Sequence, residues 1–114
     1  MRQAQDRSAF YGRWRIIDSE LWDREALDLI VPAHITFGDE GLGTMELIAI
    51  GASIDYRVSL RNAQAYVEFS WCGEDDGDFA CGRGWAARKG DTLEGKLFIH
   101  QGDESGFAAE RDSG

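Results

Sequence analysis

The chain has 114 residues and a mass of 12.7 kDa, the usual size of one domain, and can bury a core without a disulfide or a structural metal. Hydrophobic residues make up 43% and charged residues 29%, which excludes a disordered or fibrous chain. The formal charge of −9 disfavours nucleic acid and anionic membrane surfaces as partners, and no apolar run reaches the ~20 residues that cross a bilayer. We therefore expect one globular domain with no nucleic-acid or membrane partner.

The N-terminal third contains the only predicted helix. Residues 1–10 predict a loose arm, followed by a single domain over residues 11–112. After a first strand, Asp23 is a suitable N-cap for one short helix near residues 23–31, which Pro32 ends. No further segment is typical of a helix.

The rest of the chain alternates between apolar and polar residues, with glycine in most of the turns and Asn62 in one, at hairpin spacing. Short strands at this spacing indicate a sandwich or barrel, and short connections favour an antiparallel meander. We predict an all-β fold, an antiparallel up-and-down meander barrel of about eight strands with one short helix between strands 1 and 2. The expected strands cover residues 12–21, 33–37, 44–50, 53–60, 64–72, 79–88, 93–100 and 107–111.

The apolar phase of these strands predicts the core, and two glycines in the strand at 79–88, Gly82 and Gly84, indicate a bulge or a close backbone approach. Charged residues on the opposite phase are expected on the outer face, because burying unpaired charge is costly. The alternative is that some polar faces point inward and line a pocket. The expected core includes Trp14, Ile16, Ile54, Val58, Val67, Phe69, Trp71, Trp85, Leu97 and Phe107, and the charged residues are Glu46, Asp55, Arg57, Glu68, Arg83 and Lys96.

A G-x-W sequence, Gly12-Arg13-Trp14, enters the first strand, and Arg111 ends the last one. With the helix and the meander, this order resembles the calycins, the group of lipocalins and fatty-acid-binding proteins. The stretches GRWRIIDSELWD and GRGWA are also similar to small bacterial proteins of similar length. The calycin resemblance implies that Trp14 packs at a closed end of the barrel under Arg111. It also implies a module that binds a small, mostly apolar ligand.

The ligand would enter at the end opposite Trp14. A meander places the turns after strands three, five and seven at that end, together with the start of the helix. The candidate ligand-binding residues are Trp22, Leu29, Phe79 and His100 around the mouth, with Tyr56 and Glu68 deeper in the barrel.

The reactive side chains predict no catalytic or metal site. Cys72 and Cys81 are expected to be unpaired thiols, because the N-terminus lacks the apolar stretch of a signal peptide and a cytoplasmic location follows as the default. The acidic run at 74–78 does not have the ligand spacing of a calcium loop and is expected to be a solvated hairpin tip. His34 is expected to be a partly buried structural histidine. We expect no metal and no cofactor.

Two other functions remain open. The first is an acidic protein-interaction domain with a fully packed barrel, whose partner is a basic protein or a second copy of the chain. The second is an enzyme that uses His100 with Glu68 or Glu46 for acid–base chemistry, which the spacing does not support. A continuous interior cavity of at least ~300 Å³ would favour ligand binding, whereas a packed interior would favour interaction.

Overall fold

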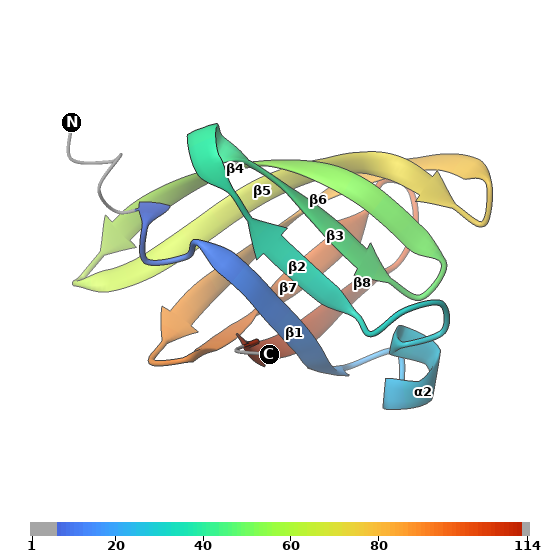
Figure 1. Ribbon diagram of the computed structural model, residues 1–114, viewed down its shortest axis with the longest axis horizontal. Helices are drawn as coiled ribbons and strands as arrows, with labels where there is room; N and C mark the ends of the chain where they lie inside the picture. The colour runs from blue at the N-terminus through green and yellow to red at the C-terminus, as the bar shows by residue number, and fades with distance from the viewer. Residues whose placement is uncertain (1–6, 113–114) are drawn as a thin grey trace.

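One closed sheet makes up nearly all of the fold in the computed structural model, which describes residues 7–112 (Figure 1). The expected all-β meander barrel, with one short helix between strands 1 and 2, is confirmed. In chain order the elements are β1 (Gly12–Ser19), α2 (Arg24–Leu27), β2 (His34–Phe37), the 3₁₀ turn η1 (Asp39–Gly41), β3 (Leu42–Leu47), β4 (Ile50–Arg61), β5 (Gln64–Asp75), β6 (Asp78–Lys89), β7 (Thr92–Ile99) and β8 (Glu104–Arg111).

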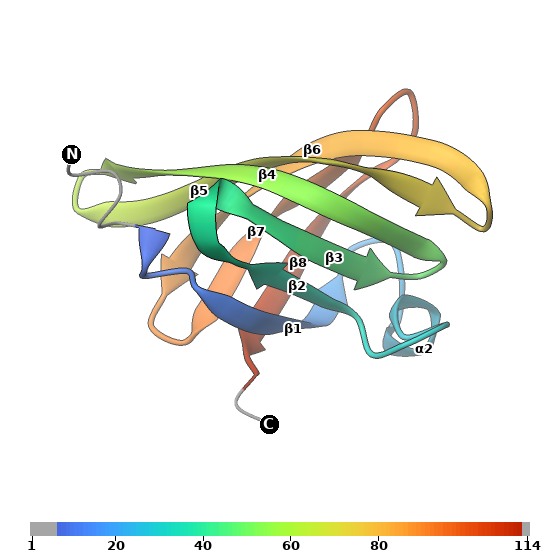
Figure 2. The ribbon, with the colours of Figure 1, turned by 45° about the horizontal axis from the view of Figure 1, so that its top comes forward.

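The barrel closes where β8 returns to pair with β1 (Figure 2). Trp14 lies opposite Arg111 and Ser19 opposite Phe107 across this seam, and the register shifts between Ile16 and Asp18. The other seven pairings join strands that follow one another in the sequence, all antiparallel. Closure pairs both edges of all eight strands, which removes a common route to aggregation.

The inner face carries the apolar half of each alternation, as predicted. Eight of the ten expected core residues are buried, and Phe107 packs half-buried against them. The eight are Trp14, Ile16, Ile54, Val58, Val67, Phe69, Trp71 and Leu97. The mid-strand charged residues point outward, as expected.

The prediction of Trp85 as a core residue is wrong, because its side chain lies on the outer face and is 37% exposed. Gly82 and Gly84 occupy two inner positions of β6, beneath aromatic rings from β5. A Cβ added to Gly84 would lie 2.4 Å from Cζ of Phe69, and one added to Gly82 would lie 1.9 Å from the Phe98 carbonyl oxygen and 2.9 Å from the Trp71 ring. The expected close backbone approach at these glycines is confirmed, and strand alternation then turns Trp85 outward.

The helix is shorter than predicted. Asp23 is its N-cap, with Oδ1 accepting a hydrogen bond from Ala26 N at 2.9 Å, but the helix ends at Leu27. Asp28 follows as the C-cap, and its Oδ1 accepts a hydrogen bond from Ala33 N at 2.8 Å. This side-chain bond redirects the chain before Pro32 and leaves Leu29 and Ile30 exposed.

The two ends of the barrel differ in what covers them. The α2 end carries α2 and the turns after β3, β5 and β7, as the meander predicted (Figure 1). The Trp14 end carries the turns after β2, β4 and β6, together with Phe10. Phe10, the last residue of the segment expected to be a loose arm, is completely buried, and residues 1–6 of that segment lie outside the described residues.

Candidate functional site

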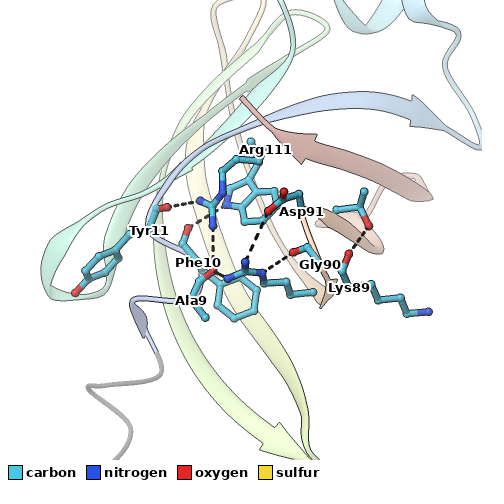
Figure 3. Close-up of polar contacts among 10 residues, drawn as sticks. Ala9, Phe10, Tyr11, Lys89, Gly90, Asp91 and Arg111 are labelled. Carbon is cyan, nitrogen blue, oxygen red and sulfur yellow. Dashed lines mark hydrogen bonds and ion pairs between the residues drawn. The ribbon is translucent and has the colours of Figure 1, made fainter. Parts of the chain in front are cut away.

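The Trp14 end is closed by stacked and hydrogen-bonded side chains (Figure 3). Trp14 is fully buried, and its Nε1 donates a hydrogen bond to the Phe10 carbonyl at 2.9 Å. The Arg111 guanidinium lies 4.0 Å from the centre of the Trp14 ring and donates to the Tyr11 carbonyl. Arg88 adds a bond from its guanidinium to the Ala9 carbonyl. Among residues 7–112, these contacts cover the Trp14 end of the barrel.

Burial and the neighbouring Arg88 charge lower the pKa of Arg111, while Asp91 raises it. An arginine pKa is so high that the guanidinium keeps its charge at any physiological pH. The stacking on Trp14 is therefore a permanent cation–π contact.

Within residues 7–112, the interior next to α2 holds a small apolar cavity of about 10 Å³, which is room for about one water molecule. Trp22 and Leu27 cover it from the α2 side, and Phe69 lies among its walls. Hydroxyl groups connect the strands at its edge: Ser19 Oγ and Ser105 Oγ are 3.0 Å apart, and Ser105 Oγ accepts from Leu21 N at 3.2 Å. The barrel interior is therefore closely packed beneath α2.

One polar group inside the barrel is unsatisfied. The indole Nε1 of Trp71 is buried and has no hydrogen-bond partner among residues 7–112. A buried unpaired N–H donor costs about 1–3 kcal/mol, so it is a natural contact point for a water molecule or a ligand acceptor.

Four predicted site residues lie at the α2 end but do not share one pocket. Trp22 is half-buried and lines the interior cavity, whereas His100 lines a separate surface hollow beside the β7–β8 turn. Leu29 and Phe79 are 60% and 75% exposed, on the α2–β2 connection and at the start of β6. The predicted mouth is thus spread around the rim.

The two deeper candidates lie elsewhere. Tyr56 is buried, and its hydroxyl donates to the Gly38 carbonyl at 2.6 Å, in the β2–β3 connection of the Trp14 end. Burial raises the pKa of this phenol, with smaller contributions from Tyr11 and Asp39. Glu68 lies on the outer face, where its Oε2 is 3.4 Å from Arg61 Nη2.

His34, expected to be partly buried, is buried, and its ring contacts neighbouring strands. Its Nδ1 lies 2.9 Å from the Pro32 carbonyl and 3.1 Å from Arg13 Nη2, and its Nε2 lies 3.5 Å from Glu46 Oε1. The ring therefore joins the outer face of β2 to β1 and β3.

A feature that the sequence reasoning missed is a groove of about 530 Å³ at the α2 end, hereafter the rim groove. Aliphatic side chains and carboxylates line it together, and no Lys or Arg from residues 7–112 is in its lining. The β3–β4 and β5–β6 turns meet there, because Asp76 N donates to the Ala49 carbonyl at 3.1 Å. The lining comprises Ile30, Val31, Glu46, Ile48, Ala49, Ile50, Gly51, Glu74, Asp76 and Gly77.

The run Leu47-Ile48-Ala49-Ile50 was the available signal for this groove. In a strand, alternate side chains point to opposite faces, so four consecutive apolar residues cannot all point into the core. Two of them must lie at the surface or in a turn. Ile48 and Ala49 form the turn, and Ile48 adopts a left-handed backbone with φ of 55°, which is unusual for a β-branched residue. Its side chain is thereby placed at the rim.

Within residues 7–112 no group of three or more His, Cys, Asp or Glu side chains is arranged to hold a metal ion, and no helix has the length and apolarity to cross a membrane. Comparison of the chain with protein-family models, with curated proteins and with solved structures finds no match.

Proposed function

We propose that this protein is an acidic protein-interaction domain whose rim groove binds a basic, aliphatic segment of a partner protein. The observation that carries the proposal is the contrast between the interior and the rim. The interior has room for about one water molecule, whereas small-molecule sites usually measure ~300–1,000 Å³. The rim groove is far larger and lies in the open.

The chemistry of the rim groove supports this class of partner. Its aliphatic floor suits apolar side chains of an extended segment and consists of Ile30, Val31, Ile48, Ala49 and Ile50. Glu46, Glu74 and Asp76 stand around that floor, and the whole chain carries −9. Lysine and arginine side chains suit such a site, because their stems cover apolar surface while their charges meet carboxylates. A second copy of this chain would bring like charges to the groove, so a basic partner fits better.

A direct test uses a short fluorescent peptide of alternating lysine and isoleucine, with a glutamate–isoleucine peptide as its control. We expect the lysine peptide to bind at low salt and weaken as salt is added. Glu74→Gln should weaken binding about fivefold, corresponding to ~1 kcal/mol for one exposed ion pair. Glu110→Gln is the matched control, because Glu110 is an exposed carboxylate on β8, outside the groove lining.

The proposal fails if both peptides bind equally, or if neither binds. It also fails if Glu110→Gln weakens binding as much as Glu74→Gln does, because the peptide would then respond only to overall charge.

A second candidate function is binding of a small apolar molecule beneath α2, as in the calycins. Three observations favour it: the apolar cavity, the unsatisfied Trp71 Nε1, and Trp14 stacked under Arg111 as the resemblance implies. Entry would require Leu27 and Trp22 to move outward. Titration of ¹⁵N-labelled protein with palmitate, retinol and an amphipathic amine tests this, since a ligand should shift the indole N–H signals of Trp71 and Trp22. Unchanged signals across the panel would eliminate this candidate.

Both functions would operate in the cytoplasm, the location expected from the sequence. That location can be tested separately. The protein is fused to a fluorescent protein and expressed in its own host, and cell fractionation then shows which fraction contains the fusion.

A further inference from the structure

The two cysteines face each other across adjacent strands. Cys72 of β5 and Cys81 of β6 are direct cross-strand partners, so both side chains lie on the same face of the sheet, outside the barrel. Neither is in a disulfide. We propose that this pair is a dithiol site that reacts with a small disulfide and closes to a reversible cross-strand disulfide. The inference does not depend on the proposed function, since neither thiol lines the rim groove.

The hydrogen-bond pattern places the pair at the closer kind of antiparallel position. The Cys81 carbonyl accepts a hydrogen bond from His100 N at 2.8 Å, so its backbone polar groups point toward β7 and away from Cys72. The β5–β6 turn agrees: Asp76 and Gly77 both have positive φ, as in a two-residue hairpin loop. Counting from the hydrogen-bonded pair Asp75↔Asp78, the pair Cys72↔Cys81 falls at a non-hydrogen-bonded position.

Residues opposite each other at such a position have Cα atoms ~4.5 Å apart, inside the ~4.4–6.8 Å range of natural disulfides. A bond between the two sulfur atoms therefore requires side-chain rotation and little movement of the strands. The short separation is at the tight end of the range, which favours a bond that small thiols can reduce again.

A small reagent can reach both thiols. Cys72 is exposed, and Cys81 is half-exposed in the wall of a surface hollow of about 440 Å³. Arg83 and His100 also line this hollow, which lies beside the β7–β8 turn. An incoming disulfide thus has open access to one sulfur and space beside the other.

The reaction consists of two exchanges. The Cys72 thiolate attacks one sulfur of the small disulfide, whose S–S bond breaks and releases one thiolate. The Cys81 thiolate then attacks Sγ of Cys72, which forms the protein disulfide and releases the second thiolate. Two protein thiols are oxidised, one small disulfide is reduced to two thiols, and the two cysteine protons end on the released thiolates.

The test treats the reduced full chain with oxidised glutathione under argon and measures intact mass and free thiols. We expect both free thiols to disappear, with a mass loss of two hydrogen atoms and no retained glutathione. Dithiothreitol should restore both thiols. Cys72→Ser and Cys81→Ser should each retain one glutathione as a mixed disulfide, because the second exchange is then impossible.

The matched control is the double variant Cys81→Ser with Arg83→Cys. It keeps one thiol on each of the two strands, but the thiol on β6 is now the diagonal neighbour of Cys72 instead of its direct partner. Diagonal neighbours lie ~7–8 Å apart, beyond bridging range, so this variant should retain glutathione at both positions. The proposal is overturned if the unmodified chain also retains mixed disulfides, links to a second chain, or does not react.

Discussion

The Trp14 end and the α2 end of this barrel differ in how their side chains are held in place. At the Trp14 end, two arginines join a buried tryptophan to the backbone of the preceding segment, so side chains from distant parts of the chain depend on one another. At the α2 end, a four-residue helix buries one leucine, and large apolar side chains lie exposed beside carboxylates. The comparison predicts that the first end contributes more to the stability of the fold, and the proposed binding groove lies at the second.

The comparison predicts that a substitution at the Trp14 end destabilises the whole barrel. Trp14→Ala should lower the free energy of unfolding by about 3–5 kcal/mol, because it removes a fully buried ring and the surface on which Arg111 stacks. Urea denaturation monitored by circular dichroism measures this loss. An unchanged midpoint would show that the Trp14 end does not stabilise the barrel.

A substitution at the α2 end should destabilise only the neighbouring segments. Leu27→Ala should cost about 2 kcal/mol, the low end for a buried leucine, because so short a helix can move inward and fill the space. Hydrogen exchange should accelerate at residues 24–31 and in the β3–β4 turn, whose Ile48 N donates to the Leu27 carbonyl at 2.8 Å. Faster exchange throughout the barrel would contradict the contrast between the ends.

Two arginines that stack on aromatic rings allow a sharper test. Arg111→Gln should cost about 1–2 kcal/mol, because it removes a cation–π contact and a charged donor to the Tyr11 carbonyl. Arg83 makes a similar contact on the outer face, with its Cζ 4.6 Å from the centre of the Phe98 ring. Arg83→Gln should lower the free energy of unfolding by no more than ~0.5 kcal/mol. Thermal unfolding of the two variants side by side measures the difference. Equal losses would mean that the Trp14 end has no special role.

The smallest effect expected is a pH dependence confined to the α2 end. The hydrogen bond from Ala33 N lowers the pKa of Asp28 below its ordinary 3.8, and Arg15, with Nη2 2.7 Å from Oδ2, lowers it further against desolvation. Because the folded pKa is the lower one, the stabilisation is complete above the ordinary value and is lost as the pH falls through the folded pKa.

Asp28→Asn should therefore remove part of the acid sensitivity of the α2 amide signals, followed by NMR between neutral and acid pH. Asp55→Asn, on the outer face of β4, is the control and should leave that profile unchanged. Identical profiles in all three proteins would assign the acid sensitivity to other carboxylates.

The sequence allowed the barrel to be predicted because alternation, turn residues and strand spacing are local properties. The same reasoning placed Trp14 in the core and the turns after β3, β5 and β7 at one end. Trp85 was misassigned because alternation gives two phases without saying which is inner. That choice depends on the space that the Phe69 and Trp71 rings occupy above glycines of the neighbouring strand.

The candidate site was less predictable for a related reason. The rim groove depends on where Asp28 ends the helix and on two turns that meet through Asp76 and Ala49. Such contacts join segments far apart in the sequence and leave only a weak local trace, the apolar run at 47–50. The opposition of Cys72 and Cys81 likewise required the register of the β5–β6 hairpin, which turn length determines.

The seam between β1 and β8 also has a consequence for the order of folding. Every other pairing joins strands that are consecutive in the sequence, so only a short loop has to close before it forms. The seam instead pairs Trp14 with Arg111, which are separated by nearly the whole sequence of the barrel. Loop entropy makes such a pairing late. Contacts made after the transition state slow unfolding and leave the folding rate almost unchanged. We therefore expect the stacked arginine at the seam to slow unfolding more than it affects the rate of folding.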